Sequence, residues 1–345
     1  MKKILLLGMV SLFFFSCTED TKMQKVERAF YYWKSSYFES CENTALKLYR
    51  TDKLYLKYFE IDYSEAMGNY PLDKTQIGEY KRERFDSLSI VPTIFIKNEI
   101  FQYNKEGDLD KLADNIVFLV DKYNEEKFDN NLVANEIQID CDWTKSTKEK
   151  YFYLLKKIKQ LSKRNISCTL RLYPYKYPEI MGTPPVDKAM LMCYNLVKPL
   201  SSTNKNSILD LKELDSYLNL KKDYDLPLDV ALPIYSWTHW YQNNHFSGLL
   251  TLGSKEIKTF AKPIKSLWYE VTKDTTLNNE TYFRKGDQLK CEEINATLIN
   301  DAISIIKKNV ALKDGCTISL FHLDQHTLNQ YSNEEVNGFY TAFTE

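Results

Sequence analysis

Eight short apolar runs with the composition of β-strands recur along the chain, and a segment with helical spacing follows most of them. The runs are 29–33, 54–62, 90–98, 136–142, 166–173, 189–195, 227–235 and 316–324. Helical periodicity marks 109–123, 151–161 and 294–306, and Ser332-x-x-Glu335 forms a capping box before a fourth helix. Eight strands alternating with helices predict an α/β fold, a closed parallel (β/α)8 TIM barrel that binds ligands at the C-terminal ends of its strands.

Two connections depart from this alternation. The segment from Tyr173 to Lys188 contains PYKYPEIMGTPPVD, which has too many prolines for a full helix. The segment 241–293 is too long for an ordinary loop and contains the strand-like runs LWYEV and ETYFR around two asparagines. We expect 241–293 to form a small helix-plus-hairpin insertion between the seventh and eighth strands, over the mouth of the barrel.

The N-terminus has the features of an export signal. Two lysines precede an apolar run from Ile4 to Phe15, which is too short to span a membrane. Ser16-Cys17 resembles the end of a bacterial lipobox, in which the cysteine is lipidated and becomes the first residue of the mature protein. We therefore expect a signal peptide at 1–16, lipidation at Cys17, a polar tether at 17–27 and one barrel domain at 28–345. An ordinary secretory signal is the alternative.

The expected location is the cell envelope of a Gram-negative bacterium, where the lipid would anchor the protein at the outer membrane or on its periplasmic side. A formal net charge of −1, spread along the chain, gives no sign of a nucleic-acid partner. We expect a monomer. The cysteines after the anchor form no CxxC pair, and we expect buried free thiols at Cys41, Cys141, Cys168, Cys193, Cys291 and Cys316.

The usual cofactor and metal motifs are not found in the sequence. GxGxxG, the P-loop, the GxSxG elbow and HExxH are all missing. His322 and His326 flank Asp324, but they lie at a strand end and lack the spacing of metal ligands. We therefore expect neither a cofactor nor a metal.

Alternation within the strands decides which side chains point into the barrel. In EIQIDCD, the face formed by Ile137, Ile139 and Cys141 is apolar and should pack against helices, so Asp140 and Asp142 should point inward. Asp142 lies nearer the end of the strand and is the stronger catalytic candidate, with Asp140 second. An ion pair between Asp140 and Arg171 on the next strand is the structural alternative.

Other strand ends carry side chains suited to a carbohydrate. Aromatic rings stack against the apolar faces of sugars, and polar groups bind the hydroxyls. The predicted substrate-binding residues are Trp33, Asp62, Arg171, Tyr173, Tyr194, Asn195, Tyr235, Trp237 and Asp324. Asp142 together with Asp62, Glu60 or Asp324 would supply the two carboxyl groups that glycoside hydrolysis uses.

Three segments carry a family resemblance. IDCDW resembles the fourth-strand signature DxxDxDxE of the family-18 glycoside hydrolases, the chitinase-type barrels. LMCYN is similar to that family's sixth-strand M-x-Y-D, and ALPIYSW to its seventh-strand G-x-P-x-Y-G. The segments GTPPVD, LMCYN and LPLDVALPIYSW also resemble those of a family of Bacteroidetes-type lipoproteins. The resemblance implies a glycoside-hydrolase-like barrel that handles carbohydrate.

The sequence departs from the family at the residue that matters most for catalysis. The resemblance implies that the last glutamate of the signature protonates the leaving group, but here Thr144 stands in its place and Ile137 replaces the first aspartate. A threonine hydroxyl does not titrate near neutral pH and cannot act as this acid. We expect a cell-envelope lipoprotein that acts on or binds a carbohydrate, and a glycoside hydrolase with a non-standard carboxylate arrangement is the enzymatic form of this hypothesis. The alternative is a non-catalytic barrel that binds glycan or protein at the cell surface.

Overall fold

The computed structural model describes residues 23–36, 40–76, 88–128, 133–200, 204–220, 223–277 and 281–345. The signal peptide, Cys17 and the first part of the tether lie outside these residues, so those expectations stay predictions. Within the described ranges, no helix has the length and apolar character needed to cross a membrane.

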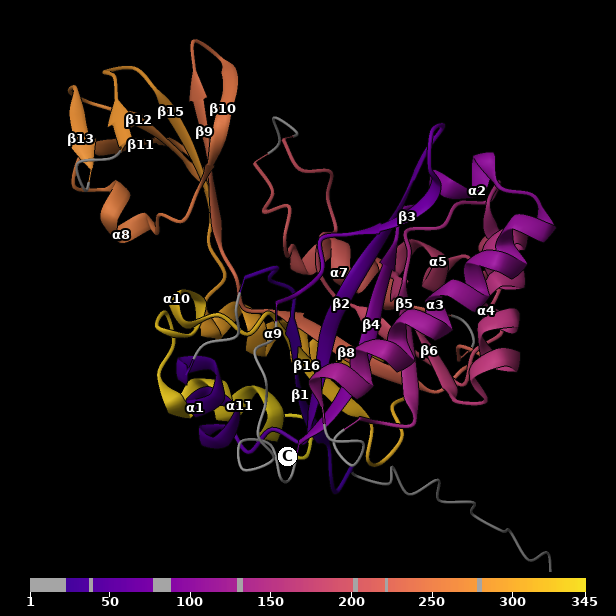
Figure 1. Cartoon of the computed structure of the whole chain (residues 1–345). Coiled ribbons are helices and arrows are strands. Elements are labelled where there is room, and N and C mark those ends of the chain that lie inside the picture. Colours follow the sequence, from indigo (N-terminus) through magenta and orange to yellow (C-terminus); the bar gives the residue numbers. More distant parts are fainter. Residues whose placement is uncertain are drawn as a thin grey trace, which may run out of the picture.

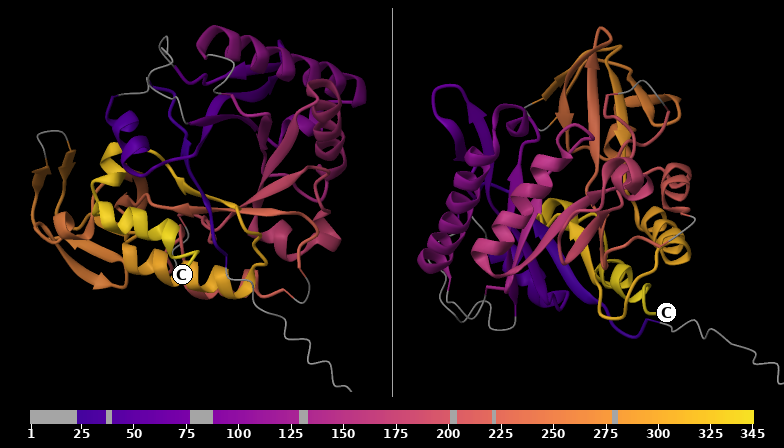
Figure 2. Two further views of the ribbon diagram at one scale, coloured as in Figure 1. Left: turned by 90° about the horizontal axis from the view of Figure 1, so that it is seen from below. Right: turned by 90° about the vertical axis from the view of Figure 1, so that its right-hand side faces the viewer.

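Eight parallel strands form a closed ring, seen from the side in Figure 1 and end-on in Figure 2. In sheet order they are β1 (Glu27–Tyr32), β16 (Thr317–Phe321), β8 (Leu228–Pro233), β7 (Lys188–Met192), β6 (Asn165–Arg171), β5 (Glu136–Asp140), β4 (Ser89–Ile96) and β2 (Lys53–Ser64). β1 pairs in parallel with both β16 and β2, which closes the ring. The (β/α)8 prediction is confirmed, and each of the eight predicted strands overlaps an observed one.

Helices cover the outside of the ring. They are α1 (Ser40–Leu48), α2 (Ile100–Tyr103), α3 (Glu106–Lys127), α4 (Lys148–Ser162), α5 (Leu172–Lys176), α6 (Pro178–Met181), α7 (Leu211–Leu218), α9 (Ala296–Asn309), α10 (Gln325–Leu328) and α11 (Asn333–Thr341). The four predicted helices correspond to α3, α4, α9 and α11. The capping box is confirmed: Glu335 N–H donates to the Ser332 hydroxyl at 3.2 Å, and Ser332 N–H donates to the Glu335 carboxylate at 2.7 Å. As its prolines predict, the segment after β6 forms only the short helices α5 and α6.

The insertion after β8 is larger than predicted and consists mainly of strands. Its elements are β9 (Trp237–Gln242), β10 (His245–Leu250), α8 (Ser254–Ile257), β11 (Ala261–Lys265), β12 (Trp268–Val271), β13 (Thr275–Leu277), β14 (Thr281–Phe283) and β15 (Gln288–Glu292). A five-stranded antiparallel sheet has the order β10-β9-β15-β12-β11, and β13 pairs with β14. The predicted hairpin is present, but its strands are β13 and β14, which flank the two asparagines in the sequence. LWYEV, the first strand of the predicted pair, lies instead in β12 between β11 and β15. The insertion rises from one side of the rim and does not lie over the mouth (Figures 1 and 2).

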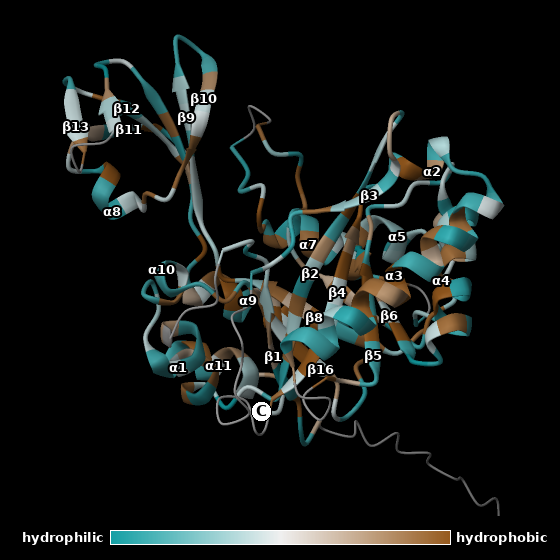
Figure 3. Cartoon of the chain, in the orientation of Figure 1, coloured by the Kyte–Doolittle hydropathy of each residue, from teal (hydrophilic) through white to brown (hydrophobic). Residues whose placement is uncertain are grey.

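The predicted faces of the barrel strands are confirmed. Ile137, Ile139 and Cys141 are fully buried on the outer face of β5, where the helices cover them. Inside the ring, the Tyr31 hydroxyl donates to Gln138 Oε1 at 2.7 Å, and the Tyr31 ring stacks on Tyr55. Figure 3 shows the apolar residues concentrated on the strands and on the helix faces toward them. All six described cysteines are free thiols, and Cys41 alone among them is not buried.

The N-terminal end of the barrel interior is held by a cation between two carboxylates. Lys188 Nζ lies 3.2 Å from Glu136 Oε2 and 2.8 Å from Asp229 Oδ2. The remaining oxygens are also bonded: Ser167 donates to Glu136 at 2.6 Å, and Thr317 N–H donates to Asp229 at 2.7 Å. Burial opposes the charge of Lys188, but the two carboxylates hold its pKa above the usual range. This arrangement ties together β5, β7 and β8.

Replacing the central cation should therefore destabilise the barrel. Lys188→Met leaves two buried carboxylates without a counter-charge, and we expect a loss of about 3 kcal/mol in the free energy of unfolding, measured by urea denaturation. Lys159→Met is the matched control, because Lys159 pairs with Asp187 at 2.6 Å on the surface and should cost less than about 1 kcal/mol. Equal losses in the two variants would contradict this account of the interior.

Candidate functional site

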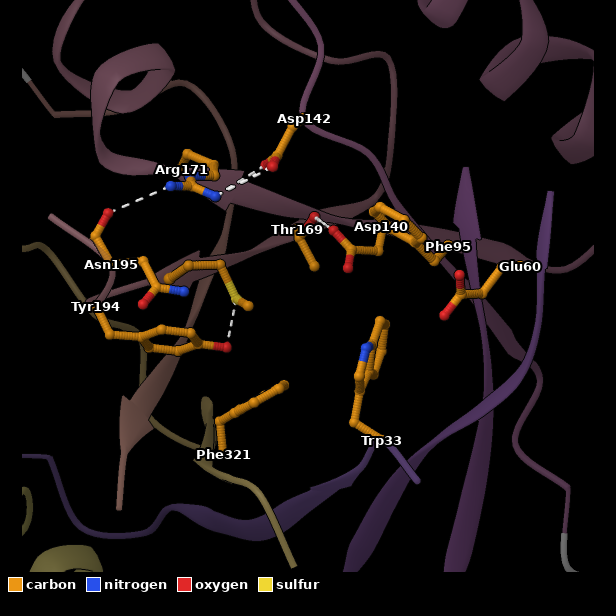
Figure 4. Close-up of a pocket in the computed structure, with 11 residues that line it drawn as sticks. Trp33, Glu60, Phe95, Asp140, Asp142, Thr169, Arg171, Tyr194, Asn195 and Phe321 are labelled. Carbon is orange, nitrogen blue, oxygen red and sulfur yellow. Dashed lines mark hydrogen bonds and ion pairs between the residues drawn. The ribbon is translucent and has the colours of Figure 1, made fainter. Parts of the chain in front are cut away.

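A pocket of about 160 Å³ opens inside the ring at the C-terminal ends of the strands (Figure 4). Seven of the eight barrel strands, or the residues directly after them, contribute to it. The lining residues are Trp33, Glu60, Phe95, Asp140, Asp142, Thr169, Arg171, Met192, Tyr194, Asn195 and Phe321. Six of the predicted site residues are thus brought together: Trp33, Asp140, Asp142, Arg171, Tyr194 and Asn195.

Asp140 ends β5 and carries the most perturbed carboxyl group of the pocket. The Thr169 hydroxyl on β6 donates to Asp140 Oδ1 at 2.5 Å. Burial raises the pKa of Asp140 from 3.8 to about 7, and the negative charges of Asp142 and Glu60 add to this effect. The Thr169 hydrogen bond and the positive charge of Arg171 oppose it without cancelling it. Asp140 is therefore poised to hold or release a proton near neutral pH.

Asp142, in the loop after β5, forms the ion pair of the site. Arg171 Nη1 lies 3.1 Å from each Asp142 carboxylate oxygen, and Arg171 Nη2 donates to the Asn195 backbone oxygen at 3.2 Å. The alternative that paired Arg171 with Asp140 is wrong. The register between β5 and β6 explains this, because Ile139 lies beside Cys168, which puts Asp140 level with Thr169 and Asp142 level with Arg171.

Glu60 on β2 lies on the same side of the pocket as Asp140, two strands away in the ring (Figure 4). Lys57 Nζ lies 2.9 Å from Glu60 Oε1 and 2.5 Å from Asp73 Oδ2, so the carboxylate is held in place. Asp62, two residues further along β2, does not reach the pocket. Its carboxylate pairs with Lys97 at 2.5 Å. The alternation places both acids on one side of β2, but the strand continues past the rim to pair with β3 (Gly68–Leu72) and carries Asp62 beyond the pocket.

The other predicted residues lie outside the pocket lining. The Tyr235 hydroxyl donates to Asn195 Oδ1 at 2.7 Å, so Tyr235 supports the pocket from behind. Trp237 belongs to β9 of the insertion, and its Nε1 donates to Glu292 at 2.6 Å. Asp324 caps α10 through Thr327 N–H at 2.9 Å and pairs with Lys34 at 2.6 Å. Tyr173, on α5, lines a neighbouring groove.

Thr144 does not take part in the pocket. Its backbone N–H donates to Thr147 Oγ1 at 2.9 Å, and its hydroxyl lies 2.9 Å from Ser146 Oγ, both at the start of α4. The position at which the family resemblance implies a catalytic glutamate is thus occupied by a threonine turned toward a helix terminus. In the part of the chain that the structure describes, no three His, Cys, Asp or Glu side chains gather to hold a metal ion.

The closed parallel barrel is similar in fold to chitinase-type glycoside-hydrolase barrels. The spore cortex-lytic enzyme of Bacillus cereus matches with a TM-score of 0.55 and 13% identity, over 94% of this chain and 75% of that chain. A chitinase of Bacteroides thetaiotaomicron matches with a TM-score of 0.52 and 10% identity, over 92% and 97%. A chitinase of Chromobacterium violaceum matches with a TM-score of 0.51 and 11% identity, over 89% of this chain and 98% of that chain. No family model and no curated protein matches the chain. At these identities the likeness establishes the fold alone.

The carboxyl group of Asp140 should titrate near pH 7, and carbon NMR of the carboxyl, assigned with Asp140→Asn, measures this. Its pKa in the folded state lies above the ordinary 3.8, so the folded protein binds the extra proton between about pH 4 and 7. Stability relative to Asp140→Asn should consequently fall by about 4 kcal/mol as the pH rises through that window, because each pKa unit corresponds to about 1.4 kcal/mol.

Thr169→Val provides the matched variant for this titration. It removes the hydroxyl that favours the ionised carboxylate, so the pKa of Asp140 should move further upward. Titration of Asp140 near pH 4 in the wild-type protein, or a downward shift in Thr169→Val, would contradict the assigned electrostatics.

Proposed function

We propose that the pocket at the mouth of the barrel binds one sugar ring of a carbohydrate. The observation that carries this proposal is the combination, in one small pocket, of the Trp33 ring with the carboxyl groups of Asp140 and Glu60. An aromatic ring offers a stacking surface for the apolar face of a sugar, while a few fixed polar groups select its hydroxyls. The fold shared with chitinases supports a carbohydrate ligand.

Asn195 is held in a way that suits it for recognition. Its backbone adopts φ 56°, a left-handed conformation that asparagine tolerates better than most residues. Its Oδ1 accepts the Tyr235 hydroxyl, which orients the side-chain amide so that Nδ2 can donate to a ligand. Arg171 binds the Asn195 backbone oxygen and so fixes the same residue from the other side. Such prior orientation lowers the entropy cost of binding a polar ligand.

A second candidate function, hydrolysis of the bound glycoside, is favoured by the raised pKa of Asp140. A general acid works best when its pKa lies near the working pH. Asp140 would donate its proton to the glycosidic oxygen as the bond from that oxygen to the sugar carbon breaks, and Glu60 would accept a proton from the attacking water. Asp142, our first candidate from the sequence, would act through its ion pair by keeping Arg171 and Asn195 in place. The non-catalytic alternative keeps the same pocket and omits the chemical step.

Binding should depend on the aromatic face of the pocket. Trp33→Ala removes the stacking surface, and we expect it to weaken binding of the glycan identified on a glycan array by about tenfold or more, measured by isothermal titration calorimetry. Trp33→Phe, which keeps an aromatic ring, should retain most of the affinity. Chitin oligosaccharides are the first ligands to test, since structurally similar proteins are chitinases. Absence of binding to any glycan would refute the proposal.

Product analysis with the same ligand separates the two candidate functions. Hydrolysis yields products that accumulate with time, and Asp140→Asn should lower the rate by about 100-fold or more while binding remains. The rate should fall as the pH rises through about 7, where Asp140 loses its proton. A stable complex without products, unaffected by incubation time, would leave the protein as a binding barrel.

We also propose that the protein is an envelope lipoprotein, anchored to the membrane through Cys17 and a tether that ends before Gln24, whose N–H donates to Asp314 at 2.8 Å. Expression in a Gram-negative host with radiolabelled palmitate should label the protein and place it in the membrane fraction, and Cys17→Ala should abolish the label. An unlabelled, soluble periplasmic protein would instead indicate an ordinary secretory signal.

A further inference from the structure

A second cavity, of about 450 Å³, lies directly beside the pocket and shares Asp142 and Arg171 with it. We call it the α6 groove. Besides the two shared residues it is lined by Trp143, Thr144, Lys145, Tyr173, Pro174, Ile180 and Met181. One wall is the loop between β5 and α4, and the other consists of the short helices α5 and α6 that replace a full helix after β6.

The two walls of the α6 groove are fixed to each other. Trp143 Nε1 donates to the Met181 backbone oxygen at 3.3 Å, and Lys148 Nζ donates to the Ile180 backbone oxygen at 3.2 Å. Gly182 ends α6 with φ 76°, and a Cβ there would lie 2.7 Å from the Phe152 ring. The chain can therefore come this close to α4 only with glycine at this position. The groove is thus built into the fold and needs no rearrangement to form.

The α6 groove exposes apolar side chains that are not needed to fill the core or to form the fold. Trp143 and Met181 form a buried floor, whereas Tyr173 and Ile180 leave 47% and 37% of their surface exposed. Exposed apolar side chains around a preformed cavity usually mark a ligand-binding site. The polar lining residues Asp142, Arg171, Thr144 and Lys145 belong to the side shared with the pocket and to the loop after β5, whereas α5 and α6 contribute only Tyr173, Pro174, Ile180 and Met181.

We propose that the α6 groove binds an apolar substituent, an alkyl or aryl group, carried by the sugar whose ring occupies the pocket. This inference rests on the proposed function of the pocket and narrows its ligand to an amphiphilic glycoside. The Arg171–Asp142 pair stands between the two cavities, and both side chains reach solvent. The polar linkage of a ligand that crosses between the cavities would lie at this pair, and its apolar arm would then reach Tyr173 and Ile180 on the wall opposite Lys145.

Matched pairs of glycosides test the proposal. Methyl and hexyl β-glycosides of glucose, galactose and N-acetylglucosamine are titrated by calorimetry against the full chain. For the sugar that binds, we expect the hexyl glycoside to bind about tenfold or more tightly than the methyl glycoside, because each buried methylene adds to affinity. Ile180→Ser should reduce this ratio to about threefold or less, since it places a hydroxyl in the wall of the groove.

Two further variants make the result specific. Ile264→Ser on β11 replaces an isoleucine of similar exposure in the insertion, and it should leave the hexyl-to-methyl ratio unchanged. Trp33→Ala in the pocket should weaken both glycosides. Equal affinities of the hexyl and methyl glycosides would refute the proposed ligand of the α6 groove. They would not contradict the proposal that the pocket binds a sugar ring. If none of the glycosides bound, the groove and the pocket would both be overturned.

Discussion

The double pairing of β1, with β16 on one side and β2 on the other, is the interaction on which the site depends. Because this pairing closes the sheet, strands on opposite sides of the ring turn their C-terminal ends toward one center. Closure of the ring thereby brings Trp33 and Glu60 into one pocket with Asp140 and Arg171, although more than a hundred residues separate Trp33 from Asp140 in the sequence.

Closure also excludes water from the interior, so each polar side chain there needs a partner. Gln138 has Tyr31, and Lys188 has two carboxylates, whereas Asp140 has only a neutral hydroxyl. Burial therefore raises the pKa of Asp140, and neither the Thr169 hydroxyl nor the charge of Arg171 offsets this effect in full.

The barrel could be predicted from the sequence because its determinants are local. Period-two alternation in EIQIDCD assigns Ile139 to the helices and Asp140 to the interior from five or six residues alone. The insertion could not be predicted in the same way, because its sheet is decided by pairing between distant segments. LWYEV, in β12, pairs with β11 on one side and with β15 on the other. No turn joins β12 directly to β15, so the sequence next to LWYEV does not indicate β15 as its partner. The two asparagines between LWYEV and ETYFR correctly indicate a local hairpin, but its first strand is β13 and not LWYEV.

Only part of the site could be predicted, because some of its residues carry a local sequence signal and others do not. Polar and aromatic residues at strand ends, such as Asn195 and Trp33, stand out from the sequence, and the structure brings them into the pocket. Phe95 and Phe321 also line it but look like ordinary core residues in an apolar run, so no sequence feature marks them. The prediction of Asp62 as a pocket residue was wrong. Alternation shows on which side of β2 the residue lies, but it does not show where along the strand the barrel rim is, and Asp62 lies beyond it. The Arg171–Asp142 pair depends on strand register, which the sequence left undetermined.

Thr144 stands where the resemblance to the family-18 glycoside hydrolases implies a glutamate, whereas Asp140 inside the ring has a carboxyl group with a pKa of about 7. Thr144 bonds to Thr147 and Ser146 at the start of α4 and does not line the pocket, so the proposed acid is Asp140. An acid in this position owes its proton to burial. A sugar ring in the pocket would displace water and bury Asp140 further, which favours the protonated form. Ligand binding and protonation of Asp140 are therefore thermodynamically linked, and this linkage holds for a binding barrel as well as for a hydrolase.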